Sequence, residues 1–212
     1  MSNEIIAAII GSCGGIIAAV IAALSARKIV KESVNSRFHS YSDNSHDVTD
    51  ILMQSQNDVF IVVLIGDRLL EEHKKYFIKL LKRGIHIRYL ILDEREHKEI
   101  ESFILGECAD VSYRNDVLRA LYELKKEYKY LFEVREFHSI TTASYICTDI
   151  ILPEKQFISS SGIQIMLYQY KTKAKVSPIT YISPKSDEKE YTTTVQSIRN
   201  MWDDATPVKW KR

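Results

Sequence analysis

Ser159, Ser160 and Ser161 precede Gly162 and place three hydroxyl groups in a predicted turn. A serine becomes a nucleophile when a histidine and an acidic residue activate it. The chain has no GxSxG motif, and no histidine and acid are evident partners of these serines. We therefore expect these hydroxyls to form hydrogen bonds and not to attack a substrate.

Metal-binding and phosphate-loop motifs are also missing from the sequence. The three cysteines show no CxxC spacing, which fits a reduced cytosolic domain, and the six histidines show no HExxH or i, i+4 pairing. Neither a Walker A loop nor GxGxxG is present, and seven glycines are too few for such a loop. We expect no metal and no cofactor. The residues concerned are Cys13, Cys108, Cys147, His39, His46, His73, His86, His97 and His138.

Alternating lysines, Lys171, Lys173 and Lys175, form the most distinctive charged run. They could hold the backbone of an oligonucleotide, or they could form a solvated strand edge that resists aggregation. The whole chain is balanced, with 29 Lys and Arg against 28 Asp and Glu. This balance argues against a general nucleic-acid-binding protein with a global basic field.

The elements that must position these residues indicate an α/β domain. Val59 to Ile65 is an unbroken apolar run, typical of a strand buried on both faces. An amphipathic helix follows and ends near Gly84, before a second buried strand from Ile85 to Leu92. Strand, helix and strand in this order predict a βαβ unit with a right-handed crossover.

The rest of the chain completes a mixed sheet. Two helices are predicted within 95–130, and a last helix begins after Asp187, which can cap it with Glu190 three residues on. The buried face of this helix is predicted to be Tyr191, Val195, Ile198 and Trp202. Further strands are predicted at 131–137, 143–153, 163–171 and 177–183.

One stretch, VREFHSITTASYICTDIILPEKQFISSSG (134–162), resembles the core of a phospholipase D-like half-domain. In that family a strand bearing HxKxxxxD is followed by a hairpin and a turn of the GS type. The strands DVFIVVLIGD and GIHIRYLILD, with the helix between them, are also similar to the family. The resemblance covers most of residues 55–208 and implies a mixed-sheet phospholipase D-like fold. In the motif, Thr142 takes the histidine position, Ser144 the lysine position and Asp149 the aspartate position.

The family's chemistry needs the histidine as nucleophile and the lysine to hold phosphate charge. Thr142 and Ser144 do neither at neutral pH, so we expect no enzyme activity. The resemblance implies that loops at the strand ends meet where the family binds phosphate, and hydroxyls, backbone N–H groups and Arg68 can bind an anion there. The expected ligand-binding residues are Gly66, Asp67, Arg68, Thr142, Ser144, Ser159, Ser160, Ser161, Lys171 and Lys173.

Simpler roles stay open for several of these residues. Arg68 could be a solvated residue at a helix start, and Asp149 could cap a turn. His138 and Arg88 fit sheet-edge positions as well as ligand contacts.

The N-terminal segment predicts a transmembrane helix. Ile5 to Ala26 is 22 residues without a charge, which as a helix is about 33 Å long and matches a bilayer core. Basic residues follow it, so the positive-inside rule places the N-terminus outside and the remaining chain in the cytoplasm. A signal peptide is the alternative, with Ala23-Leu24-Ser25 as a weak cleavage site. We expect a transmembrane helix at 1–30, a linker at 31–52 and the α/β domain at 53–212, in a single-pass protein of the cell inner membrane.

Small residues recur every four positions along this segment and include a GxxxG pair. Such a stripe lets helices in lipid approach closely. We therefore expect a homo-oligomer, for which a tetramer is the simplest guess. The expected helix-packing and pore residues are Ala7, Gly11, Ser12, Gly15, Ala19 and Ala23.

This layout resembles membrane effectors of bacterial anti-phage defence. Two groups are similar: the channel effector of the Hailong system, which is partnered by a nucleotidyltransferase, and CRISPR-associated membrane effectors with a Rossmann-like sensor. The resemblance implies an oligomeric ion channel gated by a nucleotide or oligonucleotide that the cytoplasmic domain senses. The alternatives are a membrane-tethered phospholipase D-like phosphodiesterase and a non-enzymatic membrane scaffold.

Overall fold

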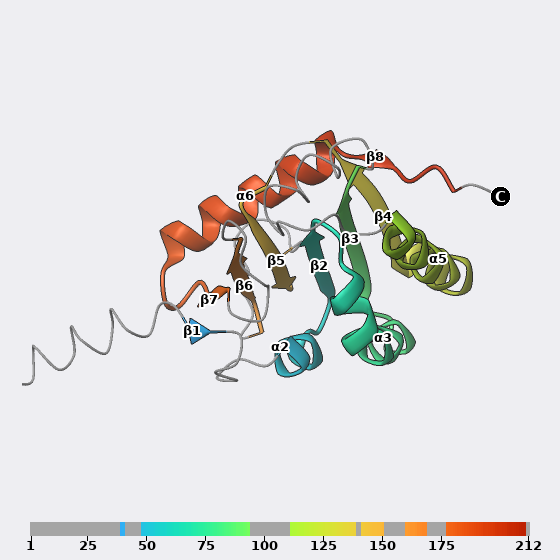
Figure 1. Cartoon of the computed structure of the whole chain (residues 1–212). Coiled ribbons are helices and arrows are strands. Elements are labelled where there is room, and N and C mark those ends of the chain that lie inside the picture. The colour runs from blue at the N-terminus through green and yellow to red at the C-terminus, as the bar shows by residue number, and fades with distance from the viewer. Residues whose placement is uncertain are drawn as a thin grey trace, which may run out of the picture. The chain divides into compact units, whose positions relative to one another are not determined.

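The computed structural model describes residues 39–40, 48–93, 111–138, 141–150, 160–168 and 177–210, which belong to one compact unit, His39–Arg212. Within them an eight-stranded sheet has the order β1-β7-β6-β5-β2-β3-β4-β8 (Figure 1). The strands are β1 (His39–Ser40), β2 (Asp58–Val63), β3 (His86–Leu92), β4 (Phe132–Phe137), β5 (Ala143–Thr148), β6 (Gly162–Leu167), β7 (Pro178–Ile182) and β8 (Thr206–Pro207). The helices are α2 (Val48–Gln54), α3 (Asp67–Lys82), α5 (Val111–Tyr128), the short 3-10 helix η1 (Lys129–Leu131) and α6 (Glu188–Asp204).

Parallel pairing joins β2, β3 and β4, which confirms the predicted βαβ unit. Val59 of β2 lies opposite Ile87 of β3, and Ile87 in turn lies opposite Phe132 of β4. All six residues of β2 are buried, as expected for a strand covered on both faces. Helix α3 connects β2 to β3, and α5 precedes β4, so both helices run antiparallel to these strands.

Antiparallel pairing builds the other half of the sheet. Strand β5 lies beside β2, with Val59 opposite Thr148, and β6 and β7 follow outward. The strand predicted at 143–153 ends earlier, at Thr148. The next residue, Asp149, has φ +55°, a left-handed conformation that ends the extended ladder.

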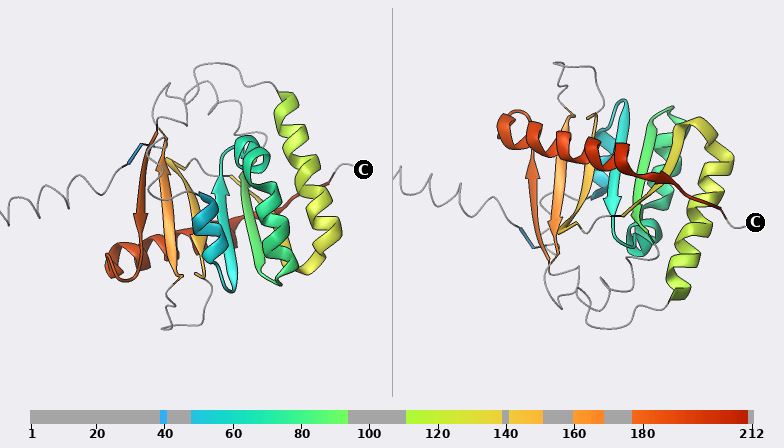
Figure 2. Two further views of the ribbon diagram at one scale, coloured as in Figure 1. Left: turned by 90° about the horizontal axis from the view of Figure 1, so that it is seen from below. Right: turned by 90° about the horizontal axis from the view of Figure 1, so that it is seen from above.

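Helices cover both faces of the sheet (Figure 2). One core cluster joins the alternate β2 residues Val59, Ile61 and Val63 to α2, α3 and α5. The second joins Phe60, Val62 and Leu64 to α6, whose buried face is Tyr191, Val195, Ile198 and Trp202 as predicted. The α/β architecture with a mixed sheet is therefore as predicted.

Two helix ends also follow the sequence signals. Gly84 has φ +81°, the left-handed conformation expected just after α3. At the start of α6, the side chain of Asp187 accepts a hydrogen bond from the Glu190 backbone N–H at 3.0 Å. The second of the helices predicted within 95–130 is α5, whereas the first falls outside the described residues.

The membrane-related expectations need correction. Among the described residues, no helix is long and apolar enough to cross a membrane. Helices α3 and α6 are instead amphipathic, with one face buried against the sheet and charged residues opposite. The predicted fold class is therefore corrected to a mixed-sheet α/β domain in the part of the chain that the structure describes, and that part contains no membrane-spanning helix for the predicted single-pass inner-membrane localisation. The residues expected to form that helix and its pore, Ala7, Gly11, Ser12, Gly15, Ala19 and Ala23, lie outside the described part of the chain.

Candidate functional site

One edge of the sheet gathers most of the chemistry-bearing side chains. We call it the carboxyl edge, because the parallel strands β2, β3 and β4 end there, where ligands bind in open α/β sheets. Strand order and register place six positions along it in sequence from β6 to β8. They are Tyr168, Thr142, Gly66, Asp93, His138 and Thr206.

Gly66 shapes the start of α3 at this edge. Its φ is +80°, and an added Cβ would lie 2.1 Å from Tyr89 Oη, so the position accepts only glycine. Gly66 is the N-cap residue of α3 and supplies no side-chain acceptor to the first amides of the helix. Free amides at a helix start attract anions.

Two charged residues follow Gly66 in the first turn of α3. Asp67 is exposed and already supplies one negative charge there. Arg68 Nε donates to Glu72 Oε1 at 2.8 Å, in a pair whose side chains are 41% and 39% exposed. An ion pair this exposed contributes little to stability, so an anionic ligand can compete for Arg68.

Thr142 and Ser144 differ sharply in access. Thr142 is exposed, and its backbone carbonyl accepts from the Tyr168 N–H at 2.8 Å. Ser144 is buried, and its side chain hydrogen-bonds to the Tyr168 hydroxyl. Tyr168 Oη also accepts from the Leu64 N–H at 3.4 Å, and burial raises the pKa of Tyr168 to about 12. The hydroxyl at position 144 is therefore committed to a neutral tyrosine, and only Thr142 is open to a ligand.

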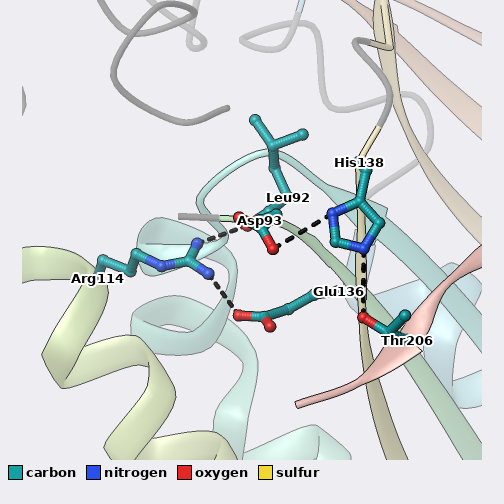
Figure 3. A network of polar contacts seen from close by, with 6 residues as sticks. All are labelled: Leu92, Asp93, Arg114, Glu136, His138 and Thr206. Atoms are coloured by element: carbon teal, nitrogen blue, oxygen red, sulfur yellow. Dashed lines mark hydrogen bonds and ion pairs between the residues drawn. The ribbon is translucent and has the colours of Figure 1, made fainter. Parts of the chain in front are cut away.

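A polar network occupies the β3–β4–β8 part of the carboxyl edge (Figure 3). His138 lies between two partners: its Nδ1 is 3.2 Å from Asp93 Oδ2, and its Nε2 is 3.3 Å from Thr206 Oγ1. Accessibility rises along this series, because Asp93 is buried whereas His138 and Thr206 are exposed. A carboxylate that orients a partly exposed imidazole is the usual arrangement of a general base.

Arg114 of α5 belongs to the same network and contacts residues of β3 and β4. Its guanidinium donates to the Leu92 carbonyl at 2.6 Å and to Glu136 Oε1 at 2.8 Å. Burial raises the pKa of Glu136 above its usual 4.5, and the Arg114 charge opposes that rise only in part. Arg114 is itself buried, and its contacts with Leu92 and Glu136 hold a positive charge within this network.

The predicted convergence of the serines with the other ligand residues is not what the structure shows. Ser160 and Ser161 lie at the opposite edge, where the Ser160 carbonyl accepts from Thr148 Oγ1 and Ser161 Oγ donates to the Asp149 carbonyl. The six residues of β5 separate them from Thr142, which is about 20 Å at 3.3 Å per residue. Ser159, Lys171 and Lys173 fall outside the described residues.

Asp149 serves the same distant edge. Its carboxylate accepts backbone N–H groups of Gln56, Asn57 and Asp58 at 2.6–3.2 Å. It therefore holds the turn that leads into β2, which agrees with the turn-capping alternative. Of the motif positions, only 142 and 144 lie near the carboxyl edge.

Sequence reasoning missed Asp93, Arg114, Glu136 and Tyr168. Asp93 carried a usable signal, because an acid directly after a buried parallel strand lies at the ligand-binding edge. Arg114 carried none, since its partners are 22 residues away in the chain. His138 was considered as a sheet-edge residue or a ligand contact, without its partners Asp93 and Thr206.

Comparisons with known proteins report similarity at the level of fold. No family model matches the chain, and no curated protein matches it. TrmBL2, an archaeal chromatin protein, has a similar structure at a TM-score of 0.50 and 13% identity, over 92% of this chain and 68% of that one. Nuc from Salmonella typhimurium, a phospholipase D family member, matches more weakly, at a TM-score of 0.46 and 10% identity, over 77% of this chain and 89% of that one. The fold is thus similar to that of a chromatin protein, and a phospholipase D family member is among its weaker structural neighbours.

Proposed function

We propose that the domain binds a phosphate-bearing ligand, a nucleotide or short oligonucleotide, at the carboxyl edge and does not cleave it. The proposal rests on the start of α3 at Gly66, which has no side-chain cap. Gly66 follows β2, and Thr142 directly precedes β5, the antiparallel neighbour of β2. Helix-start amides, the Thr142 hydroxyl and the Arg68 guanidinium are together suited to phosphate oxygens.

The expected lack of cleavage rests on positions 142 and 144. Attack on a phosphodiester needs a nucleophile and a cation that stabilises the developing charge. Within the described ranges no histidine hydrogen-bonds to Thr142, and Ser144 is buried against Tyr168. The ligand would therefore be sensed and released unchanged.

Calorimetric titration of the full chain with inorganic phosphate, AMP, ATP and a trinucleotide tests binding. Arg68→Ala should weaken binding of the best ligand by about tenfold or more, the effect of one charge-assisted hydrogen bond. Thr142→Val, which keeps the shape but removes the hydroxyl, should weaken it by about twofold to tenfold.

Arg119→Ala is the matched control, because Arg119 is also an exposed arginine in a helix-local pair, 3.6 Å from Asp116. It should leave the affinity unchanged. Equal loss in Arg68→Ala and Arg119→Ala, or no binding of any of the four ligands, would refute the proposal.

A second candidate is hydrolysis of the same ligand by His138. The specific observation is the Asp93–His138 pair at the same edge, since that pair can act as a general base. Mass spectrometry of the ligand after incubation distinguishes the two functions. An intact ligand supports binding alone, whereas turnover that His138→Gln abolishes would establish the hydrolase.

A further inference from the structure

Positive charge is concentrated at the C-terminal ends of α3 and α5. Residues 74–83 and 122–130 hold eight Lys and Arg and two Glu, a net charge of +6, whereas the whole chain has a net charge of +1. The remaining chain is therefore acidic, and this end of the helical layer carries the opposite sign. Such local asymmetry directs polyanions to one face, even in a protein of balanced composition.

The two helix ends lie side by side. Helix α3 leads into β3 and η1 leads from α5 into β4, and these strands are parallel neighbours with Ile87 opposite Phe132. Both helices pack on the same face of the sheet, and Figure 2 shows them next to each other. Their basic ends therefore meet at the amino edge, opposite the carboxyl edge.

Helix dipoles do not account for all of this charge. A cation gains from the macrodipole only within the last turn, which holds Lys79 and Lys82 in α3 and Lys125 and Lys126 in α5. Lys75 lies before that turn and Lys129 after it. Within the described ranges, none of these six lysines forms an ion pair with a carboxylate.

Backbone strain presents an aromatic ring beside these lysines. Lys129 has φ +41°, a left-handed conformation that a lysine adopts at a cost of about 1–2 kcal/mol relative to the right-handed one. Glycine would relieve this cost at such a helix end. The turn leaves Tyr130 86% exposed, the largest exposed fraction among large apolar side chains in the described part of the chain.

We propose that this basic helix-end surface, formed by Lys75, Lys79, Lys82, Lys125, Lys126, Lys129 and Tyr130, binds single-stranded nucleic acid. Lys75 and Lys79 lie over the Tyr76 ring, and Lys125 donates to the Lys129 carbonyl, but these contacts leave the lysine charges without a carboxylate to neutralise them. Such charges fit the phosphate backbone. The exposed Tyr130 ring offers a surface on which an unpaired base stacks, and a base-paired duplex has no unpaired base to place there. The surface is separate from the carboxyl edge, so the proposal does not depend on the ligand proposed there.

Fluorescence anisotropy with a labelled 20-nucleotide dT strand and a 20-base-pair duplex tests the proposal at several salt concentrations. The double variant K79E/K126E should lose about tenfold or more in affinity for the strand and show a shallower salt dependence. K185E/K189E makes the same change in net charge at exposed lysines near the start of α6 and should retain the affinity. Equal losses in the two double variants would reduce the effect to net charge and overturn the proposal.

Tyr130→Ala tests the choice of a single strand. It should weaken binding of the dT strand by about fivefold or more and leave duplex binding unchanged. Equal affinity for strand and duplex that Tyr130→Ala leaves unchanged would overturn the proposal of a single-stranded ligand. Tighter binding to vesicles of anionic lipid than to the dT strand would overturn it too.

Lys129→Gly separates a binding role from a structural one. It should raise the thermal midpoint, since glycine relieves the left-handed strain, while it weakens strand binding. A lower midpoint with unchanged binding would show that Lys129 is there for the fold and contradict its place in the surface. Arg68→Ala should leave strand binding intact, so failure at one edge is distinguishable from failure at the other.

Discussion

Replacing Asp149 by alanine should destabilise the domain strongly without removing a ligand contact. The Asp149 side chain is buried and accepts three backbone N–H groups of the turn before β2, the shortest from Asn57 at 2.6 Å. Alanine leaves those donors without their acceptor. It also has to adopt φ +55°, which aspartate tolerates better.

The magnitude follows from the environment of each donor. Gln56 and Asn57 are exposed, so water can replace part of what their N–H groups lose, whereas Asp58 is buried. At about 1 kcal/mol for each of the former and about 2 kcal/mol for the latter, the lost hydrogen bonds total roughly 4 kcal/mol. Left-handed strain adds about 1 kcal/mol, giving a loss of about 5 kcal/mol against a typical stability of 5–15 kcal/mol.

Urea unfolding followed by circular dichroism measures this loss. Asp149→Asn is the matched variant, because asparagine keeps one acceptor oxygen and tolerates the left-handed region, and it should lose about half as much. A loss under about 1 kcal/mol in Asp149→Ala would refute the assignment of Asp149 to the turn. So would weaker ligand binding at unchanged stability, because that would place Asp149 at a ligand site.

Three further predictions concern the sheet edges and the core. Gly66→Ala should lower the free energy of unfolding by about 2–4 kcal/mol, through left-handed strain and the close approach to Tyr89 Oη. Adding Tyr89→Phe should restore part of this loss, and no recovery would contradict a role of the Tyr89 hydroxyl and leave backbone strain and the approach to Val63 Cγ2 as the cause. Burial raises the pKa of Glu136 above 4.5, so the folded state holds the Glu136 proton more tightly than the unfolded state does. The contribution of Glu136 to stability is therefore present at low pH and declines as pH rises through the folded pKa. Glu136→Gln should flatten that decline in urea titrations across pH 4–8, and an unchanged pH dependence would contradict this role of Glu136. Cys147 is buried, and burial raises the pKa of its thiol. In a C13S/C108S background, Cys147 should therefore react with a thiol reagent only after the protein unfolds. Rapid labelling of the folded protein would contradict this prediction and show that β5 opens.

The strands and helices with strong periodicity were predictable from the sequence. The apolar runs of β2 and β3 and the capping pair at Asp187 depend on neighbours in the chain, and the structure agrees with them closely. Strand β5 was predicted too long, because its end depends on Asp149 and its partners more than 90 residues away. No local pattern encodes a contact of that range.

Site residues were less accessible to sequence reasoning for the same reason. The serine turn and Thr142 were grouped because the resemblance implied that the loops at the strand ends meet, yet they lie beyond opposite ends of β5 and therefore at opposite edges of the sheet. Conversely, Asp93, Arg114 and His138 come from three separate elements, and only the parallel register brings them together. Residue type and spacing indicate which chemistry a side chain can perform, whereas the order of the strands in the sheet decides which side chains lie at the same site.

The division of the sheet into a parallel and an antiparallel half has a kinetic consequence. Strands β2 and β3 pair with their immediate successors, β3 and β4, whereas β5 inserts beside β2, so that Val59 pairs with Thr148. Closing so long a loop carries a large entropic barrier, and contacts of that range tend to form late in folding. The hydrogen bonds from residues 56–58 to Asp149 should then be absent from the transition state. We expect Asp149→Asn to speed unfolding and leave the refolding rate nearly unchanged, so this single carboxylate would set how long the folded domain persists.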